Sequence, residues 1–354
     1  MLKRQEYRNW SSEFHDKHSL EPIVIQLELT YRCPLHCLHC YSDCYNTAKH
    51  AQRELSTSKI KKIIDNLFKA GCFWLCFTGG DPLMRNDFLD LYEHARKKGF
   101  IVTVFTSLIT LNSTVLKKFI EKPPFSIETT LNGATKEVFE KISCVEGSFE
   151  KAISNLRKIR GAKLPLKIKT KLSKNNIHEL HKLKKLVESF DCEFLPNAEI
   201  YPRLDGDLKP CEYRLPLRDY PQSDYKVADG CHKVNRAFAG KKQNTRPNRY
   251  FRCGVGNWLW HINPYGELNI CTYVREPAYN VFKGDLLEGI YKLSNYVRTK
   301  EFETESECRY CKAWEFCQSC PGKARLEMKN EELPIPYFCE LAHRIAREEE
   351  MYLK

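Results

Sequence analysis

Three cysteines near the start of the chain are spaced like the ligands of a metal cofactor. Cys33, Cys37 and Cys40 form a C-x3-C-x2-C pattern that follows an apolar stretch. Three thiolates this close in sequence can hold three corners of a [4Fe–4S] cube, which leaves one iron without a local protein ligand. An open iron indicates chemistry on a bound molecule rather than electron storage. Zinc is the alternative, since its paired cysteines commonly stand two to four residues apart.

A second set of cysteines lies in the last third of the chain. Its members are Cys253, Cys271, Cys308, Cys311, Cys317, Cys320 and Cys339. The segment 264–271 reads as a hairpin with Gly266 at a turn that requires positive φ. Two neighbouring C-x2-C pairs are also typical of a zinc ribbon. Five residues between the pairs is short for a ribbon, and three further cysteines would remain unexplained.

Composition places the chain among cofactor proteins of a reducing compartment. It has 354 residues, 17 of them cysteine, and the N-terminus shows no apolar signal region. A lysine-rich chain of this kind favours metal or cluster binding over a disulfide scaffold. No apolar run reaches membrane-spanning length, so we expect a cytoplasmic protein without a membrane partner.

The net charge of +12 is concentrated in one stretch, because residues 151–190 contain twelve Lys or Arg and two Glu. This stretch reads either as a solvated outer helix pair or as a docking surface for an acidic partner such as a peptide leader. We expect no nucleic-acid partner, because the basic run lacks the interleaved aromatic residues that stack on bases.

Strand and helix patterns alternate over the first two hundred residues. The expected strands are 23–27, 73–77, 101–105, 126–130, 166–170 and 192–195. Repeated strand–helix units predict parallel strands joined by right-handed crossovers. The predicted fold class is therefore α/β, with a partial (β/α)6 TIM-type barrel that is open on one side. Functional residues are expected at the carboxyl ends of its strands.

The loop after the second expected strand contains Gly79, Gly80 and Asp81, followed by proline. Two glycines allow close approach to the backbone, and a carboxylate can accept a hydrogen bond from an ammonium group. Such a loop alone is weak evidence, since Gly-Gly-Asp turns commonly join a strand to a helix.

Together, the cysteine triplet and this loop resemble the radical S-adenosylmethionine (SAM) superfamily. In that family the open iron chelates SAM, and a Gly-Gly-Glu-Pro motif holds the methionine ammonium. Here Asp81 replaces the usual glutamate and is one methylene shorter. The resemblance implies that one [4Fe–4S] cluster binds at Cys33, Cys37 and Cys40. It also implies a set of SAM-binding residues, namely Tyr41, Gly79, Gly80, Asp81, Ser107 and Glu128.

The later cysteines resemble the SPASM extension, a small cysteine-rich iron–sulfur domain that carries auxiliary [4Fe–4S] clusters. By that resemblance Cys308, Cys311, Cys317 and Cys339 hold one auxiliary cluster. Cys253, Cys271 and Cys320 hold a second cluster nearer the active site. Its fourth ligand is Cys231 as first choice, Cys211 as second, or an open iron that binds substrate. The family usually has three residues before the cysteine matched to Cys320, and this chain has two.

We divide the chain accordingly into five segments. They are an N-terminal extension (1–20), the radical SAM partial barrel (21–200), a connecting segment (201–245), the SPASM domain (246–345) and a C-terminal tail (346–354). Residues 1–20 are too few for a leader-binding domain, so we expect a separate protein to recruit the substrate, or the basic barrel face to do so. An electron donor such as flavodoxin or ferredoxin is also expected.

The resemblance implies an enzyme that cleaves SAM to a 5′-deoxyadenosyl radical and oxidatively modifies a ribosomally made precursor peptide, by cross-linking, dehydrogenation or excision. One alternative is a sulfatase (formylglycine) maturase, although Thr272 stands where that family generally has aspartate. A tetrapyrrole or another small molecule is another possible substrate. A zinc protein that binds nucleic acid is the non-enzymatic alternative.

Several residues have roles that the sequence leaves open. Cys72, Cys76, Cys144 and Cys192 fall in strand or helix patterns and are expected to be buried apolar residues. Cys44 reads equally as a spectator or a functional thiol. Candidate general bases near the sixth expected strand are Glu199, Asp205 and Asp207.

Overall fold

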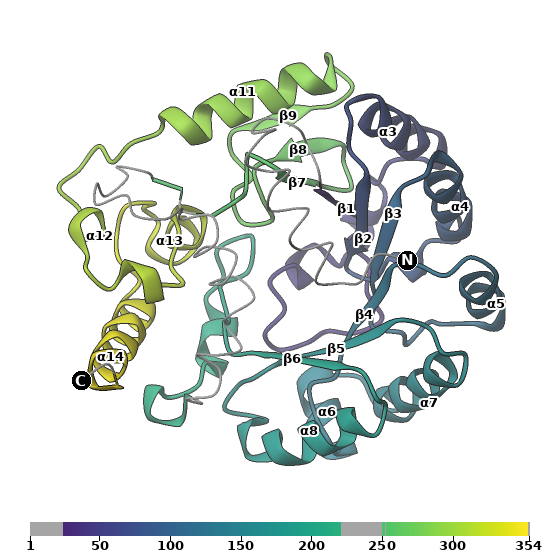
Figure 1. The fold of residues 1–354 in the computed structure, drawn as a ribbon, viewed down its shortest axis with the longest axis horizontal. Helices are drawn as coiled ribbons and strands as arrows, with labels where there is room; N and C mark the ends of the chain where they lie inside the picture. The colour runs from purple at the N-terminus through teal and green to yellow at the C-terminus, as the bar shows by residue number, and fades with distance from the viewer. Residues whose placement is uncertain (1–23, 221–249, 252, 353–354) are drawn as a thin grey trace.

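The computed structural model describes residues 24–220, 250–251 and 253–352 (Figure 1). The expected N-terminal extension, residues 1–20, and the proposed cluster ligand Cys231 lie outside these residues. Among the described helices, none is long and apolar enough to cross a membrane.

One nine-stranded sheet organises the described chain. Its strand order is β6-β5-β4-β3-β2-β1-β7-β8-β9. The strands are β1 (Val24–Thr30), β2 (Trp74–Gly79), β3 (Ile101–Phe105), β4 (Ser126–Thr130), β5 (Leu166–Lys171), β6 (Glu193–Asn197), β7 (Leu259–Ile262), β8 (Glu267–Asn269) and β9 (Ala278–Asn280). Strands β1 to β6 pair in parallel, β7 adds to β1 in parallel, and the last two pairings are antiparallel.

Helices surround the outer side of the six parallel strands, so the sheet curves into an open barrel (Figure 1). The helices of this part are α2 (Ala48–Ala51), α3 (Thr57–Lys69), α4 (Phe88–Lys98), α5 (Ser113–Glu121), α6 (Lys136–Ser143), α7 (Ser148–Gly161) and α8 (Leu180–Glu188). Short 3-10 turns are η1 (Asp43–Tyr45), η2 (Pro82–Met84), η3 (Ile177–Glu179), η4 (Lys209–Tyr213) and η5 (Leu217–Asp219).

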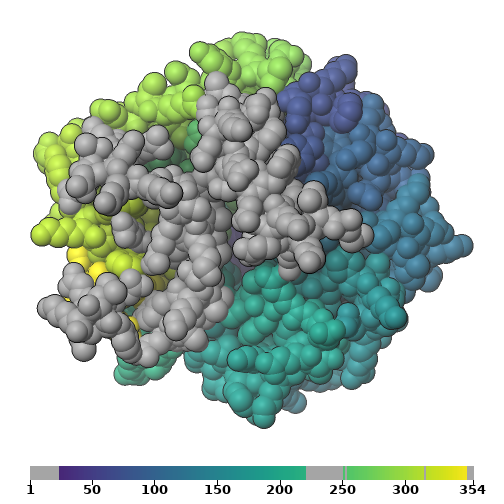
Figure 2. Space-filling model, in the orientation of Figure 1, coloured from purple at the N-terminus to yellow at the C-terminus, as the bar shows by residue number. Residues whose placement is uncertain are grey.

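The C-terminal part is mostly helical and lies beside the open edge of the barrel. It contains α11 (Leu286–Thr299), α12 (Glu307–Tyr310), η6 (Trp314–Phe316), α13 (Pro321–Met328) and α14 (Pro336–Tyr352). In the space-filling view, these residues are coloured green to yellow and adjoin the purple and teal residues of the barrel (Figure 2). The small cysteine-rich domain therefore packs against the barrel and extends its sheet.

Local hydrogen bonds and backbone conformation explain where two of the helices begin or end. Asn112 precedes α5, and its side chain accepts a hydrogen bond from the Val115 N–H, a typical N-cap. Gly99 ends α4 with φ of 96°, a left-handed conformation that glycine adopts without steric cost. Leu27 and Glu28, adjacent residues of β1 on opposite faces of the sheet, are both almost fully buried, as expected for a parallel strand covered on both faces.

The six expected parallel strands are confirmed, with ends that differ by at most three residues. The expected hairpin is also present, because β7 and β8 flank Gly266, whose φ is 81°. The parallel addition of β7 to β1 was not predicted. Four residues, Leu259 to Ile262, carry too short a pattern to reveal their partner, yet they join the cysteine-rich region to the barrel.

A buried carboxylate stabilises the junction between β1 and the hairpin. The Glu28 side chain is 1% exposed, and its Oε2 lies 3.1 Å from both Arg275 Nη2 and His261 Nε2. Burial would raise the pKa of Glu28, but the charges of His261 and Arg275 outweigh it and lower that pKa to about 2. Glu28 therefore stays ionised and holds β1, β7 and the segment after β8 together.

We expect Glu28→Gln to lower the thermal unfolding midpoint of the anaerobically purified protein. The substitution leaves the buried Arg275 guanidinium without its counter-charge, a change that typically costs about 3 kcal/mol. Glu93→Gln is the matched control, because Glu93 pairs with Lys118 at 2.6 Å on the partly exposed barrel surface. Equal midpoints for both variants would contradict a stabilising role for Glu28.

Candidate functional site

The first cysteine triplet lies in the loop that follows β1, at the carboxyl end of the barrel strands. Asn46 holds the start of this loop from both sides: its Oδ1 accepts from the Cys33 N–H at 3.2 Å, and its Nδ2 donates to the Cys33 carbonyl at 3.1 Å. A turn between the Cys40 N–H and the Cys37 carbonyl, 2.9 Å long, brings the other two cysteines together. Asn46 carried no signal in the sequence.

The three thiols of this loop influence one another electrostatically. Burial raises the pKa of the Cys37 thiol, and charges at Cys40 and Cys33 raise it further. Thiolates crowded in this way repel one another unless a cation lies among them. The arrangement therefore fits a positively charged iron–sulfur group, which coordinates the deprotonated sulfurs.

Gly79 at the end of β2 and Gly80 directly after it are required by the chain's own backbone. A Cβ on Gly79 would lie 2.1 Å from the Thr30 carbonyl oxygen, and one on Gly80 would lie 2.4 Å from that of Arg32. The Gly80 N–H donates to the Thr30 carbonyl at 2.7 Å. The loop after β2 therefore lies directly against the segment that leads into the cysteine triplet.

Asp81 is fully buried, and its carboxylate is hydrogen-bonded by other groups of the protein. It accepts hydrogen bonds from Thr106 Oγ1 at 2.8 Å, from the Ser107 N–H at 3.0 Å and from the Leu83 N–H at 3.0 Å. The Ser107 hydroxyl also donates to it. Burial raises the pKa of Asp81, and these donors oppose that rise. Asp81 thus fixes the Gly-Gly loop to the end of β3, while its contact with SAM remains a prediction.

Glu128 points into the barrel, where lysines of β5 neutralise it. Its carboxylate oxygens lie 2.6 Å from Lys169 Nζ and 3.4 Å from Lys167 Nζ. Burial would raise the pKa of Glu128, but the two ammonium groups outweigh it and lower that pKa. Lys169 also lies 3.6 Å from the centre of the Phe105 ring. The predicted contact of Glu128 with SAM stays a prediction.

His39 is a candidate site residue that the sequence analysis missed. It stands between two cysteines of the triplet, and its Nε2 lies 3.5 Å from Asn132 Nδ2. Burial and the nearby Lys171 ammonium lower the pKa of His39 to about 3. The imidazole is therefore neutral at pH 7, which suits contact with an uncharged ring or a hydrogen-bond donor. The position of His39 between Cys37 and Cys40 was the one feature of the sequence that could have indicated its role.

A chain of aromatic rings connects the cysteine groups. The Tyr41 and Tyr273 ring centres are 5.4 Å apart, those of Tyr273 and Tyr201 are 5.2 Å apart, and those of Tyr201 and Phe338 are 5.3 Å apart. Tyr41 follows Cys40 and Phe338 precedes Cys339 in the sequence. The predicted SAM-site residue Tyr41 therefore lies at one end of a packed path toward the C-terminal domain.

The side chains of Glu199, Tyr201 and Lys323 are in contact along this aromatic path. Lys323 Nζ lies 2.5 Å from the Tyr201 hydroxyl and 3.5 Å from Glu199 Oε2, and the Tyr201 hydroxyl donates to Glu199. Burial would raise the pKa of Glu199, but Lys323 and Lys171 outweigh it and lower that pKa. The other candidate bases, Asp205 and Asp207, are exposed on a loop. Glu199 is thus the interior member of the three candidates.

The second cysteine group gathers around Cys271. Burial raises the pKa of its thiol to about 12, and charges at Cys320 and Cys253 contribute to the rise. The Val274 N–H donates to Cys271 Sγ at 3.4 Å, a contact that would favour the thiolate. The alternative ligand Cys211 lies on η4, where Arg214 and Glu327 are its charged neighbours.

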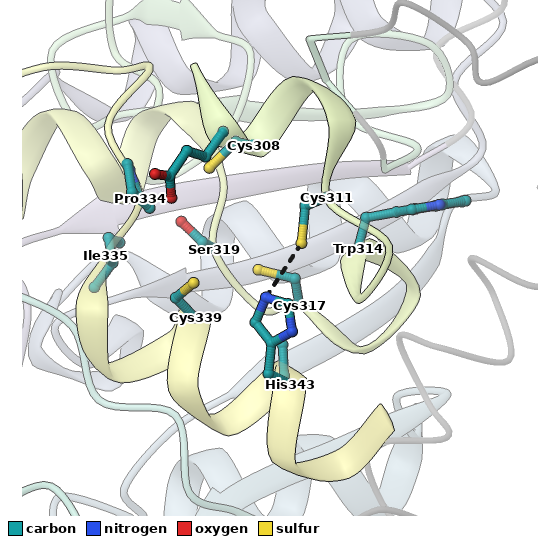
Figure 3. A pocket seen from close by; sticks show the side chains of 11 residues that line it. Cys308, Cys311, Trp314, Cys317, Ser319, Pro334, Ile335, Cys339 and His343 are labelled. Atoms are coloured by element: carbon teal, nitrogen blue, oxygen red, sulfur yellow. Dashed lines mark hydrogen bonds between the residues drawn. The ribbon is translucent and has the colours of Figure 1, made fainter. Parts of the chain in front are cut away.

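The third group surrounds a cavity of about 130 Å³ (Figure 3). Four sulfurs line it, those of Cys308, Cys311, Cys317 and Cys339. No three His, Cys, Asp or Glu side chains within the described ranges are placed to bind a single metal ion. The cavity exceeds the ~30 Å³ share of a water molecule in the liquid several-fold, so its size and its thiol lining fit a polynuclear iron–sulfur group.

The remaining cysteines differ in environment. Cys72 and Cys76 are buried, as expected, and Cys192 is half-buried. The expectation of a buried Cys144 is wrong, because this residue ends α6 in a left-handed conformation with φ of 57° and is exposed. Cys44 Sγ donates to the Tyr41 carbonyl at 3.7 Å and so packs beside the triplet loop.

An open parallel barrel with a three-cysteine loop at its carboxyl edge defines the class of protein as a cofactor-dependent α/β enzyme. Residues 27–187 match the model of the radical SAM superfamily. The matched residues form the barrel, which is therefore a radical SAM domain, and the cofactors of that superfamily are SAM and a [4Fe–4S] cluster.

Relatives and solved structures extend the similarity beyond the barrel. The mycofactocin maturase MftC of Mycobacterium tuberculosis (strain CDC 1551 / Oshkosh) is 26% identical over 309 residues, covering 84% of this chain and 77% of the relative. The AdoMet-dependent heme synthase of Methanosarcina barkeri (strain Fusaro / DSM 804) is 28% identical over 324 residues, covering 86% and 92%. The crystal structure of Streptococcus suis SuiB bound to precursor peptide SuiA matches with a TM-score of 0.68 at 16% identity, covering 93% and 78%.

These similarities confirm the predicted fold class. A partial (β/α)6 barrel is followed by a small cysteine-rich domain of the SPASM type, and the match to SuiB, which covers 93% of this chain, includes most of that domain. The barrel is not closed, since β6 forms one edge of the sheet and β9 the other.

We predict that Asp81→Ala will weaken SAM binding at least about tenfold, equivalent to about 1.4 kcal/mol, while iron content stays unchanged. The loss of the carboxylate leaves the Thr106 hydroxyl and two backbone N–H groups without their acceptor and frees the Gly-Gly loop. Equilibrium dialysis of SAM with the reconstituted protein measures the effect. Asp90→Ala, which removes an exposed carboxylate from α4, is the control.

The family's usual residue provides a second comparison at this position. Asp81→Glu adds a methylene to a site with no exposed surface, so we expect weakened SAM binding there as well. Wild-type affinity in Asp81→Ala would show that the carboxylate does not position the loop.

Proposed function

We propose that the chain is a radical SAM maturase that oxidatively modifies a ribosomally synthesised precursor peptide. When SAM is bound at the iron–sulfur cluster, its reductive cleavage supplies a 5′-deoxyadenosyl radical that removes hydrogen from the substrate. The peptide substrate is supported by the similarity to MftC over 84% of the chain and by the fold shared with peptide-bound SuiB.

The observation that carries this proposal is the separation of the cysteines into three groups inside one fold. Cys33, Cys37 and Cys40 would hold the SAM-binding cluster. Two auxiliary clusters would follow the sequence prediction, the first at Cys253, Cys271 and Cys320, the second at the four cysteines around the cavity. The spatial grouping supports this division, because the thiols of each proposed set lie near one another.

Different residues of the chain would bind SAM and accept a proton from the substrate radical. Gly79, Gly80 and Asp81 shape the loop beside the SAM cluster, and Ser107 secures it from β3. Glu199 is our candidate proton acceptor, because it lies on the aromatic path between the cysteine groups. A substrate radical that gives one electron to an auxiliary cluster and one proton to Glu199 would lose two hydrogens overall, counting the hydrogen already removed.

The partners of the reaction follow from the same proposal. The precursor peptide would be recruited by a separate leader-binding protein or by the basic helices α7 and α8, whose outer faces carry exposed lysines such as Lys158 and Lys184. A flavodoxin or ferredoxin would supply electrons to the SAM-binding cluster. The enzyme would work in a reducing cytoplasm, because a chain with 17 cysteines at cluster-like spacings favours metal or cluster binding over disulfides.

A tetrapyrrole-modifying activity is the second candidate. Its support is the AdoMet-dependent heme synthase, which aligns over 86% of this chain at 28% identity. The two candidates share SAM cleavage and differ in the molecule that loses hydrogen.

Iron analysis tests the division of the cysteines. Anaerobically reconstituted protein should hold about twelve iron atoms, four for each of three clusters. Replacing Cys33, Cys37 and Cys40 with alanine should remove about four of these atoms and abolish 5′-deoxyadenosine formation. Cys72→Ala, which removes a buried thiol outside the three groups, should change neither quantity. A triple variant that still cleaves SAM would refute the assignment.

Product analysis tests the substrate. The reduced enzyme should be incubated with SAM and with peptides encoded by short reading frames beside its gene, or with an iron porphyrin precursor. We expect mass spectrometry to show a peptide that has lost two hydrogens or a larger fragment, and an unchanged porphyrin. Conversion of the porphyrin alone would replace the peptide proposal with the second candidate.

A further inference from the structure

The cavity of the third cysteine group contains one potential donor that the cysteine pattern does not include. His343 lines the cavity together with the four cysteines, and its Nε2 lies 3.7 Å from Cys311 Sγ (Figure 3). This distance is within hydrogen-bond reach of a sulfur atom. The imidazole faces the thiol directly, as the dashed line in the figure marks.

The fold holds this histidine in place through α14. Cys339 and His343 are four residues apart on that helix and therefore lie on the same face. The opposite face is buried through Phe338, Leu341 and Ile345, which anchor the helix in the C-terminal core. His343 itself is exposed, so its ring lies where the cavity meets solvent.

We propose that His343 is a positioning residue that donates a hydrogen bond from Nε2 to the Cys311 thiolate and thereby raises the reduction potential of the auxiliary cluster. This inference rests on the proposed function, which places a cluster on Cys308, Cys311, Cys317 and Cys339. Four cysteines complete the ligand set of such a cluster, so the imidazole is left to act from outside it.

The direction of the effect follows from charge. A reduced cluster carries one more negative charge than an oxidised one, and part of that charge resides on the thiolate sulfurs. A donor held at a sulfur stabilises the reduced state more, so the cluster accepts an electron more readily. In the proposed reaction, this favours transfer of an electron from the substrate radical to the cluster.

The test measures the potential of this cluster in the full-length, reconstituted protein. Alanine at Cys33, Cys37 and Cys40 removes the SAM-binding cluster, so redox titration by electron paramagnetic resonance reports the auxiliary clusters. The signal that disappears in a further Cys317→Ala variant identifies the cluster of interest. In the same background, His343→Phe keeps a planar ring without a donor, and His343→Gln keeps an N–H donor.

We expect His343→Phe to lower the ratio of reduced to oxidised cluster about tenfold at a fixed potential, a shift of about 59 mV for one electron. His343→Gln should recover part of that shift. Arg347→Gln is the control, because Arg347 is exposed one turn further along α14 and outside the cavity lining. It should leave the potential unchanged, which would show that the shift depends on the hydrogen-bond donor at the cavity.

Three results would overturn the inference, and they are distinguishable. An unchanged potential in His343→Phe would show that the hydrogen bond from His343 does not raise the reduction potential, and the cluster assignment would stand. Loss of about four iron atoms in that variant would make His343 a ligand or a support of the cavity instead. A parent protein without any cluster at the four cysteines would refute the proposed auxiliary site itself.

Discussion

The buried carboxylate of Glu28 is the interaction on which the arrangement of the whole molecule depends. Its strand leads directly to the first cysteine triplet, and its partners belong to the hairpin region that carries Cys271. An ionised group with 1% exposure is tolerated only where opposite charges meet it. Glu28, His261 and Arg275 therefore fix the loop of the first triplet and the region of Cys271 relative to each other, although more than two hundred residues separate them in the chain.

Backbone packing supplies the second constraint at the same place. The Gly-Gly loop lies so close to the end of β1 that no side chain fits between them, and Asp81 secures this loop from behind. The predicted contact of these glycines with a ligand stays a prediction, and the structure shows that they also allow close packing of the chain's own backbone. Close approach of the backbone at Gly79 and Gly80 and the buried hydrogen bonds of Asp81 give a rigid wall beside the cysteine triplet.

Much of the fold could be predicted because its signals are local. Apolar strand runs and the turn glycine Gly266 each act within a few residues, and the predicted strands and hairpin formed there. The addition of β7 to β1 could not be predicted, because strand pairing across a long sequence separation leaves no local pattern. Cys144 shows the same limit, since an exposed helix end and a buried helix face look alike in sequence.

The residues of the candidate site were also predictable only in part. The cysteine spacing predicts cluster-binding groups, and this role stays a prediction. The importance of His39, Asn46, Tyr201 and Lys323 depends on neighbours that only the fold brings together. Glu199 was one of three possible bases in the sequence. Its distinction lies in its interior position beside the Tyr201 hydroxyl and the Lys323 ammonium, which no spacing rule could reveal.

We propose that this one fold holds three separate iron–sulfur clusters. Anomalous diffraction at the iron absorption edge, from crystals of the anaerobically reconstituted protein, would locate each cluster. We expect three separate iron peaks, one beside Cys37, one beside Cys271 and one among Cys311, Cys317 and Cys339. A single peak at the first triplet, with zinc or no metal at the later cysteines, would contradict it.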